Sequence, residues 1–437
     1  MTRAAHALPL VGHALSFARD KPAFLRACHQ QYGDCVRLEI GGPTWLLNDP
    51  VDIKHVLVDA AAKYEKTPKL TSVRGRALSG SGLHTATGLD HVFLRRMVQP
   101  LFHRRIVEGH TQMVRAVTEH ALSGWREGAT VDLLEEMLRL TQQIMMRALF
   151  GESFVDPGGR FADAVTARRA YIEHFFTSNL PSPEHWPLPV VRRYRRARRH
   201  MAAVIQEEIA RRRVSGSTEN DWLSMLVAST GRDGTPLTNA QIQDEAFTLT
   251  STGYETVASA LTWAGHLLST HVDVQQALRA EVVASDAPDA PLLTRVLNES
   301  MRLYPPTWLF VRVAVAADTL PGGTTVRIGD SMYLSPYTMH RHPQWYAHPD
   351  RFDTEHFSES AVRDRPRFAY YPFGGGARQC IGEPFARLES AIILATILRR
   401  FHVEPASSRT VVMRPSIVME PRGGLAIRLR RGRAPER

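Results

Sequence analysis

Residues 371–382 combine the residue types of a metal-binding loop. They read Tyr-Pro-Phe-Gly-Gly-Gly-Ala-Arg-Gln-Cys-Ile-Gly and stand just before a helical stretch, 384–398. Three consecutive glycines let the backbone come close to a bound group. Cys380, beside Arg378 and among free N–H groups at the start of the helix, should have a lowered pKa, and its thiolate would be a soft metal ligand. The alternative is a buried, inert cysteine, and the glycines and the cation argue against it.

A dinucleotide-binding loop is a second explanation for the glycines. Its fingerprint needs a third glycine at the position that Gln379 occupies. The residues before the loop, Tyr-Tyr-Pro, do not form a plausible buried strand. The sequence therefore favours the metal-binding interpretation.

The loop also resembles the heme-binding signature of the cytochrome P450 monooxygenases, and it fills every specified position: Phe373, Gly376, Arg378, Cys380 and Gly382. Three further segments are similar to motifs of that family. They are His91-x-x-x-Arg95, Thr252-Gly253-Tyr254-Glu255-Thr256, and Glu299-x-x-Arg302 followed by residues 349–352. One motif could occur by chance, but four in the family's order extend the resemblance over most of the chain.

The resemblance implies heme b, iron protoporphyrin IX, as the cofactor, with the Cys380 thiolate as the ligand of its iron. Phe373, Gly376 and Gly382 would belong to the cofactor-binding loop. The candidates for the two heme propionates, carboxylates that suit forked guanidinium donors, are Arg378, Arg312, Arg95 and His91. For each of these the alternative is a solvent-exposed cation, and this alternative competes most strongly at His91.

The resemblance assigns Thr252, Gly253, Glu255 and Thr256 to the oxygen-binding side of the heme. Thr256 is similar to the threonine that hydrogen-bonds bound oxygen in the family, and Glu255 would relay protons through water. Gly253 inside a helix costs up to about 1 kcal/mol relative to alanine, and a cofactor lying against the helix would explain it. Thr252 departs from the family pattern, in which Ala or Gly is commoner. Its hydroxyl could bond a backbone carbonyl or join the water chain.

Glu299 and Arg302 are one helical turn apart and can form an ion pair on the same face of a helix. By resemblance, Arg351 from a later loop joins them in a buried structural triad. We expect no catalytic role for this triad, and an exposed pair would contribute little.

The resemblance maps the walls of a substrate pocket to residues 84–88, 175–180, 247–252, 307–311 and 417–419. The side chains expected there are Phe247, Trp308, Leu309, Phe310, Val418 and Met419. They predict a hydrophobic chamber for a terpenoid, a polyketide or a fatty acyl chain. Residues 304–308 resemble a segment of bacterial terpene hydroxylases. Ordinary core packing is an equally good explanation for each aromatic position.

The elements that must position these residues are mostly helical. Helical spacing runs from residue 92 to 398, and strand-like alternation is confined to 36–40, 310–315, 325–334 and 425–429. Thr238 and Gln241 have capping-box spacing and begin a long central helix whose buried stripe continues to Leu268. We predict a mainly α fold with a small β part. By resemblance this is the cytochrome P450 fold, with heme between the central helix and the cysteine loop.

The composition excludes several classes of protein. With 437 residues and 43% apolar residues, the chain can bury a large core and is neither disordered nor collagen-like. Three cysteines are too few for a disulfide framework. There is no apolar run of the length that a membrane helix needs and no signal-peptide pattern, so we expect a cytoplasmic protein with no membrane partner. No linker divides it, and we predict one domain over 1–437: a β-richer N-terminal part, a helical body and a heme-binding loop at 371–384.

Charge offers a second possible function. The net charge is +10, only five of the 54 cations are lysine, and arginines crowd 192–199. Apolar residues at helical spacing, such as Tyr194 and Met201, indicate an amphipathic helix with a solvated basic face rather than a nucleic-acid site. The arginine excess is typical of a GC-rich bacterial genome.

Together with the motifs, the resemblance implies a heme-thiolate monooxygenase that inserts one oxygen atom of O2 into a C–H bond of a hydrophobic secondary metabolite. The sequence has no flavin or nicotinamide site, so we expect electrons from a ferredoxin and its reductase, docking near Arg378 and Arg387, and a monomeric protein. Two alternatives remain. One is a peroxide-driven peroxygenase, which Glu255 and Thr256 disfavour because that chemistry can dispense with a proton relay. The other is a non-catalytic heme-thiolate sensor.

Overall fold

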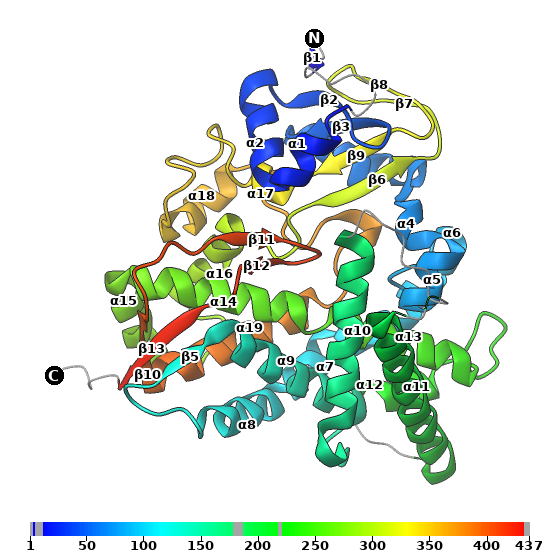
Figure 1. Ribbon diagram of the computed structural model, residues 1–437, viewed down its shortest axis with the longest axis vertical. Helices are drawn as coiled ribbons and strands as arrows, with labels where there is room; N and C mark the ends of the chain where they lie inside the picture. Colours follow the sequence, from blue (N-terminus) through cyan, green and yellow to red (C-terminus); the bar gives the residue numbers. More distant parts are fainter. Residues whose placement is uncertain (1–2, 5–11, 178–185, 187, 217–220, 432–437) are drawn as a thin grey trace.

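A computed structural model describes residues 3–4, 12–177, 186, 188–216 and 221–431 (Figure 1). Of the predicted pocket walls, residues 178–180 lie outside these ranges. The longer helices form the body of the molecule: α2 Lys21–Tyr32, α6 Gly88–Val98, α8 Thr111–Leu122, α9 Leu133–Phe150, α10 Arg160–Thr177, α11 Pro189–Ser215, α13 Asn239–Thr252, α14 Glu255–Thr270, α15 Val272–Ala284, α16 Pro291–Leu303 and α19 Glu383–Arg400.

Short helices and single turns connect these elements. The short α-helices are α1 Ala14–Arg19, α3 Pro50–Lys54, α4 Pro68–Thr71, α5 Val73–Ser79, α7 Arg104–Gly109, α12 Trp222–Ala228, α17 Pro336–Met339 and α18 Glu359–Asp364. The π-helical and 3-10 turns are η1 His55–Asp59, η2 Ala61–Lys63, η3 Gln99–Phe102, η4 Pro157–Gly159, η5 Thr354–Phe357, η6 Arg367–Ala369 and η7 Gly376–Arg378.

The largest sheet has six strands in the order β1-β2-β3-β9-β6-β4 and lies at the top in Figure 1. Its strands are β1 Arg3–Ala4, β2 Cys35–Glu39, β3 Pro43–Leu47, β9 Ser331–Leu334, β6 Phe310–Ala314 and β4 Tyr64–Lys66. A three-stranded sheet joins β10 Phe401–Pro405, β13 Ala426–Arg431 and β5 Thr130–Asp132. Two strand pairs complete the set: β11 Met413–Pro415 with β12 Met419–Pro421, and β7 Asp318–Thr319 with β8 Thr325–Val326.

The predicted strands are confirmed at three of four places. The segments 36–40, 310–315 and 425–429 correspond to β2, β6 and β13. The predicted strand 325–334 is interrupted, because Gly329 has a φ of +91° and Asp330 turns back to accept a hydrogen bond from Arg327 N at 3.0 Å. This turn leaves β8 and β9 as separate strands.

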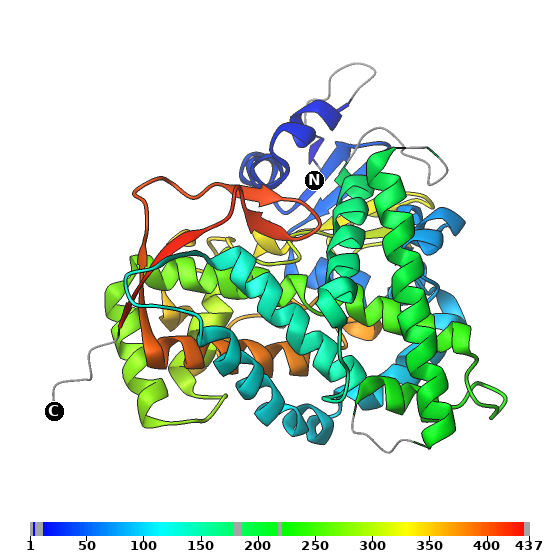
Figure 2. The same ribbon diagram turned by 60° about the horizontal axis from the view of Figure 1, so that its bottom comes forward.

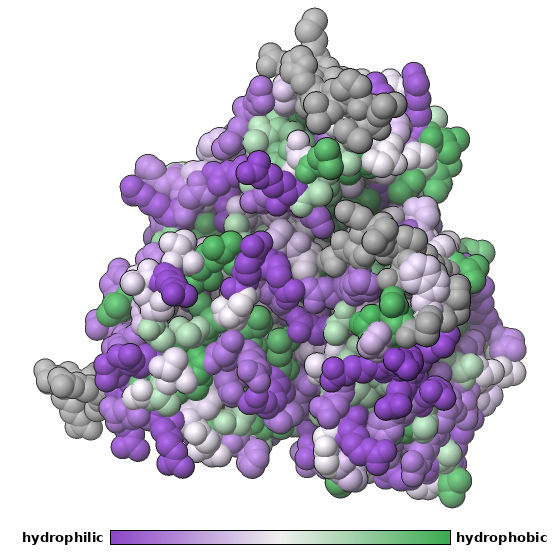
Figure 3. All heavy atoms as spheres, viewed as in Figure 1, coloured by the Kyte–Doolittle hydropathy of each residue, from purple (hydrophilic) through white to green (hydrophobic). Residues whose placement is uncertain are grey.

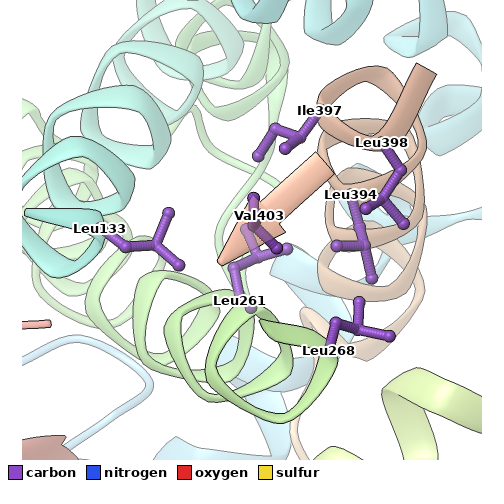
Figure 4. A pocket seen from close by; sticks show the side chains of 8 residues that line it. Leu133, Leu261, Leu268, Leu394, Ile397, Leu398 and Val403 are labelled. Atoms are coloured by element: carbon purple, nitrogen blue, oxygen red, sulfur yellow. The ribbon is translucent and has the colours of Figure 1, made fainter. Parts of the chain in front are cut away.

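The core is organised around α14, which packs on α9, α16, α19 and β10. Gly265 allows the close approach of α9, since a Cβ there would lie 2.3 Å from Leu133 Cδ2. Figure 4 shows a small apolar void at this junction; it is lined by Leu133, Leu261, Gly265, Leu268, Leu394, Ile397, Leu398 and Val403. These residues include no chemically reactive side chain, so the void belongs to the core.

The predicted central helix is broken into two. The capping box of Thr238 and Gln241 begins α13 as expected, but α13 ends at Thr252 and α14 begins at Glu255. Gly253 lies in the break, where a Cβ would be 2.7 Å from Leu249 O and 3.3 Å from Met145 Cγ. The protein's own atoms are therefore one reason for this glycine, and the break agrees with the locally loosened helix that a bound cofactor and oxygen would need here.

The basic segment forms the amphipathic helix α11 as predicted. Its buried residues recur every three or four positions: Val191, Tyr194, Ala197, Met201, Ile205, Ile209 and Arg212. The helix lies beside α10 (Figure 2), and the surface over it is predominantly hydrophilic (Figure 3). Within the described residues, none of the helices is both long enough and apolar enough to cross a membrane.

Candidate active site

The cysteine loop is held by packing on its protein side. Gly376 has a φ of +67°, and a Cβ there would lie 2.0 Å from the carbonyl oxygen of Leu57 in η1. A Cβ on Gly375 would lie 2.4 Å from the ring of Phe368 in η6. These two glycines are therefore required by the close packing of the loop on η1 and η6.

The thiol of Cys380 faces a space inside the protein. Its side chain is exposed by surface area, yet burial raises the pKa of the thiol to about 11. The exposed surface and the raised pKa of Cys380 agree when the accessible surface of its side chain lines a space inside the protein. Gly382 borders this space, because a Cβ there would lie 4.0 Å from Cys380 Sγ and 3.6 Å from the Phe102 ring. The loop closes through Cys380 N, which donates to Phe373 O at 2.9 Å.

The sequence suggested a lowered pKa for Cys380. This prediction is wrong when only the groups of the protein act on the thiol, because its pKa is then raised. Backbone N–H groups of Gly382 and Glu383 do lower the pKa, but the loss of solvation outweighs them. A metal cation at Sγ would reverse the balance, because a thiol that coordinates a metal gives up its proton.

Cations gather beside this space from four segments: Lys66 of β4, Arg95 of α6, Arg312 of β6 and Arg378 of η7. One carboxylate among the described residues forms an ion pair with them, Glu65, whose Oε2 lies 2.5 Å from Arg378 Nη2. Burial and repulsion by neighbouring arginines lower the pKa of Lys66 to about 7 and that of Arg312 to about 10.

This cation cluster fits a cofactor with two carboxylates. A buried cation that has lost its water of hydration and has no carboxylate partner destabilises the fold, unless an anion binds beside it. Heme b supplies two propionates for the cluster and an iron for Cys380 Sγ. The donor set of the chain therefore fits heme.

His91 belongs to the same cluster. Its side chain is 5% exposed, and burial followed by the charges of Arg378 and Lys66 lowers its pKa to about 4. It is therefore a buried neutral imidazole, and the alternative of an exposed cation is wrong. One turn further on, Arg95 Nη1 donates to Gln379 O at 2.7 Å and joins α6 to the cysteine loop.

Thr252 and Thr256 flank the helix break. Thr252 is exposed although it ends a largely buried helix. Its Oγ1 donates to Thr248 O at 2.9 Å, which is the carbonyl bond expected as one of its two possible roles. Thr256 Oγ1 donates to Thr252 O at 3.4 Å.

Glu255 is held in a buried charge network that the sequence did not predict. Arg169 of α10 forms an ion pair with Glu255, with 3.2 Å between Nε and Oε2, and a second pair with Glu420 of β12. Arg414 of β11 joins Glu420 to Glu173 of α10, at 2.6 Å each. Burial raises the pKa of Glu255, and the charge of Arg169 opposes this rise.

The Glu299–Arg302 pair is fully buried, but its third side chain is His356 and not Arg351. Arg302 Nε and Nη2 donate to the two Glu299 oxygens at 2.7 Å each. His356 Nδ1 lies 3.1 Å from Glu299 Oε1. Arg351 has an exposed side chain and offers its backbone oxygen to Arg302 at 2.9 Å. The motif located the correct loop, but its spacing does not determine which side chain turns inward.

The predicted pocket residues differ in exposure. Leu309 and Phe310 are partly exposed, and the Phe310 ring lies 3.5 Å from the position that a Cβ on Gly374 would take. Phe247, Trp308, Val418 and Met419 are buried. Met419 is 0% exposed and lies in a hydrophobic cluster with Leu25, so ordinary core packing is the better description of this residue.

Comparisons with known proteins agree with this geometry. The family model described as Cytochrome P450 matches residues 3–427. Cyclooctat-9-en-7-ol 5-monooxygenase of Streptomyces melanosporofaciens is 32% identical over 92% of this chain and 90% of its own. Pentalenene oxygenase of Streptomyces avermitilis is 30% identical over 91% and 90%. A solved cytochrome P450 heme domain superposes with a TM-score of 0.87 at 25% identity, covering 99% of this chain and 98% of its own.

Proposed function

The chain belongs to the cytochrome P450 family and is a heme-dependent monooxygenase, and from this premise we propose that it hydroxylates a terpenoid. One oxygen atom of O2 enters a C–H bond of the substrate. The observation that carries the proposal is the internal space between Cys380 and the cation cluster, whose donor set fits heme. The terpenoid class is supported by the printed names of the relatives and by the apolar Leu309 and Phe310.

The chain's own residues hold the cofactor and handle protons. Cys380 would bind the iron, and the cation cluster of Lys66, Arg95, Arg312 and Arg378 would bind the propionates. When bound, heme supplies the activation of O2. Burial raises the pKa of Glu255 and the adjacent Arg169 opposes this rise, so the carboxyl beside the break can take up and release a proton.

Electrons come from a separate protein, which we propose is a ferredoxin served by a reductase. Of the two arginines expected at its docking site, Arg387 is accessible, with 39% of its side chain exposed. Arg378 is turned inward to Glu65 with 13% exposed. Docking by charge therefore relies on Arg387 and its surroundings, and Arg378 serves the interior.

The test uses the heme-loaded full chain. The reduced protein under carbon monoxide should show the red-shifted Soret band of a thiolate ligand, and Cys380→Ser should lose it. With a ferredoxin, its reductase and NADPH, a terpenoid such as pentalenene should yield a product that carries one atom from 18O2. Absence of the band in a folded, heme-loaded sample would contradict the proposal. Turnover with hydrogen peroxide but none with the ferredoxin system would instead favour a peroxygenase.

A further inference from the structure

Two carboxylates share one arginine beside the break in the central helix. Arg169 of α10 lies with its Nε 3.2 Å from Glu255 Oε2, and its Nη2 forms an ion pair with Glu420 Oε1. The side chain of Glu255 is 15% exposed, whereas that of Glu420 is 1% exposed. The acid proposed for proton transfer therefore competes with a fully buried acid for a single guanidinium.

The second oxygen of Glu420 is bound by another arginine. Arg414 stands directly across from Glu420 in the pairing of β11 with β12, and its Nη2 lies 2.6 Å from Glu420 Oε2. Arg414 Nη1 lies 2.6 Å from Glu173 Oε1 of α10, and 42% of the Arg414 side chain is exposed. Acids and arginines thus alternate from the helix break to an accessible arginine on the β11–β12 hairpin.

The hairpin that carries Glu420 is tied to the helix that begins with Glu255. Ser259 Oγ and Trp263 Nε1 of α14 both donate to Met419 O, at 2.6 and 2.8 Å. Glu255, Ser259 and Trp263 follow one another at intervals of four residues, so they lie on one face of α14. Because the backbone next to Glu420 is fixed to this face, the fold itself sets the separation of the two acids.

The charged and titratable groups that act on the Glu255 carboxyl come from α10, from β12 and from the helix break: Arg168 and Arg169, Glu420, and Tyr254. Burial raises the pKa of Glu255, the charge of Arg169 opposes this rise, and the charge of Glu420 adds to it. Glu420 acts in two ways. Its negative charge disfavours a second one nearby, and it occupies part of the guanidinium that would otherwise stabilise the Glu255 carboxylate.

We propose that Glu420 is a positioning residue of the monooxygenase reaction, which divides Arg169 between two acids and so lets Glu255 keep a proton that it can transfer. This inference rests on the proposed function and adds to it a residue of the β11–β12 hairpin. Arg414 has the opposite influence, because it neutralises Glu420 and leaves more of the Arg169 charge to Glu255. The proton itself moves only at the Glu255 carboxyl.

The experiment titrates Glu255 directly in the heme-loaded full chain. The infrared band of its protonated carboxyl is identified as the band that Glu255→Gln loses, and its intensity is followed against pH. Glu420→Gln removes a negative charge and frees Arg169, so the midpoint should fall by about one pH unit. Arg414→Gln removes a positive charge and should raise the midpoint. The pH above which turnover declines should move in the same two directions.

Both variants should fold, because the remaining charged groups keep a partner. In Glu420→Gln, Arg169 retains Glu255 and Arg414 retains Glu173. In Arg414→Gln, Glu420 retains Arg169. A merely structural network would lower the urea midpoint of both variants without moving the Glu255 titration in opposite directions.

Glu404→Gln is the matched control, because Glu404 forms an exposed ion pair with Arg430 in the three-stranded sheet, at 3.1 Å. It should leave the Glu255 titration unchanged. Unmoved midpoints in the two hairpin variants would overturn the inference, and so would shifts in the same direction or the absence of a protonated band in the wild type. Each sample is first checked for the thiolate Soret band. Its absence in the wild type refutes the proposed function itself, whereas an intact band with unmoved midpoints refutes only the role of Glu420.

Discussion

Two buried glutamates illustrate two different uses of a carboxylate in this fold. Glu299 is 0% exposed, and Arg302, His356 and the backbone N–H of Asp353 all contact its oxygens. Glu255 also pairs with an arginine, but its side chain is 15% exposed to the interior and burial raises its pKa. The first carboxylate is fully enclosed by fixed donors, and the second keeps a small exposed fraction beside the helix break.

The two glutamates differ in how many of their carboxylate acceptor positions are occupied by fixed donors, and this difference separates a structural role from a chemical one. A carboxylate whose acceptors are all occupied by fixed donors remains charged and cannot exchange a proton without breaking the fold. One that keeps an open side and a raised pKa can take up and release a proton. Glu299 therefore stabilises the loop at 349–356, and Glu255 is suited to proton transfer.

The largest effect is expected when Glu299 is replaced. Glu299→Ala leaves the guanidinium of Arg302 buried without its carboxylate, which should cost about 3 to 5 kcal/mol of unfolding free energy. Little heme-loaded protein should be recovered, and urea unfolding followed by circular dichroism measures the loss. Arg351→Ala is the control, because its exposed side chain should change stability by less than about 0.5 kcal/mol. Equal damage in the two variants would restore Arg351 to the triad.

Glu255→Gln tests the other member of the comparison. The amide keeps the size of the side chain but cannot transfer a proton, so turnover should fall roughly 10²-fold. The Soret band under carbon monoxide and the urea midpoint should stay close to wild type. If the variant instead loses heme or unfolds, Glu255 is a structural residue like Glu299.

Glu245 gives an intermediate case, since Oε1 is hydrogen-bonded to Leu83 N and Oε2 has no partner in the described part of the chain. Burial raises its pKa to about 8, above that of the unfolded chain. The protonated Glu245 carboxyl therefore makes its full contribution to the free energy of unfolding below about pH 4. This contribution is lost as the pH rises toward 8, by up to about 1.4 kcal/mol per pH unit.

Urea unfolding between pH 5 and 9 measures this dependence. The stability of the wild type relative to Glu245→Gln should decline with rising pH. Lys66 and Asp244, the charged groups near Glu245, are present in both proteins. A constant difference would show that Glu245 is ionised throughout this range.

The smallest effect is expected at Thr252. Its Oγ1 already donates to Thr248 O, so Thr252→Ala removes little that the reaction could use, and turnover should stay within about threefold of wild type. Product formed per NADPH consumed is the measurement. A tenfold or greater loss would place this hydroxyl in the proton route together with Glu255.

The sequence predicted those parts of the site whose residues are close together along the chain. The cysteine loop, the Glu299–Arg302 turn and the residues from Thr252 to Thr256 are each short enough for spacing to reveal them. Arg169 and Glu420 lie far apart in the sequence and come together only in the folded chain, so no local pattern connects them. An acid in the apolar run Ile-Val-Met-Glu at 417–420 was the one available signal.

Lys66 and His356 were missed for the same reason. Lys66 stands on a three-residue strand, β4, which is too short for its alternation to be recognised. His356 reaches Glu299 because the 3-10 turn η5 directs it inward, and a turn of this kind leaves no periodic pattern.

The break at Gly253 and Tyr254 divides the central helix into halves with different neighbours. Thr141 of α9 donates to Tyr254 O at 3.1 Å and fixes the junction, while α14 packs on the core elements α16, α19 and β10. The residues of α13 instead contact the loop before α6, through Glu245 and Leu83 N, and one arginine of α10, Arg168. Of the α13 residues, Ile242, Ala246, Phe247 and Leu249 belong to the main hydrophobic core, so mutant libraries over 239–252 should keep these four unchanged if the folding of the core is to be spared.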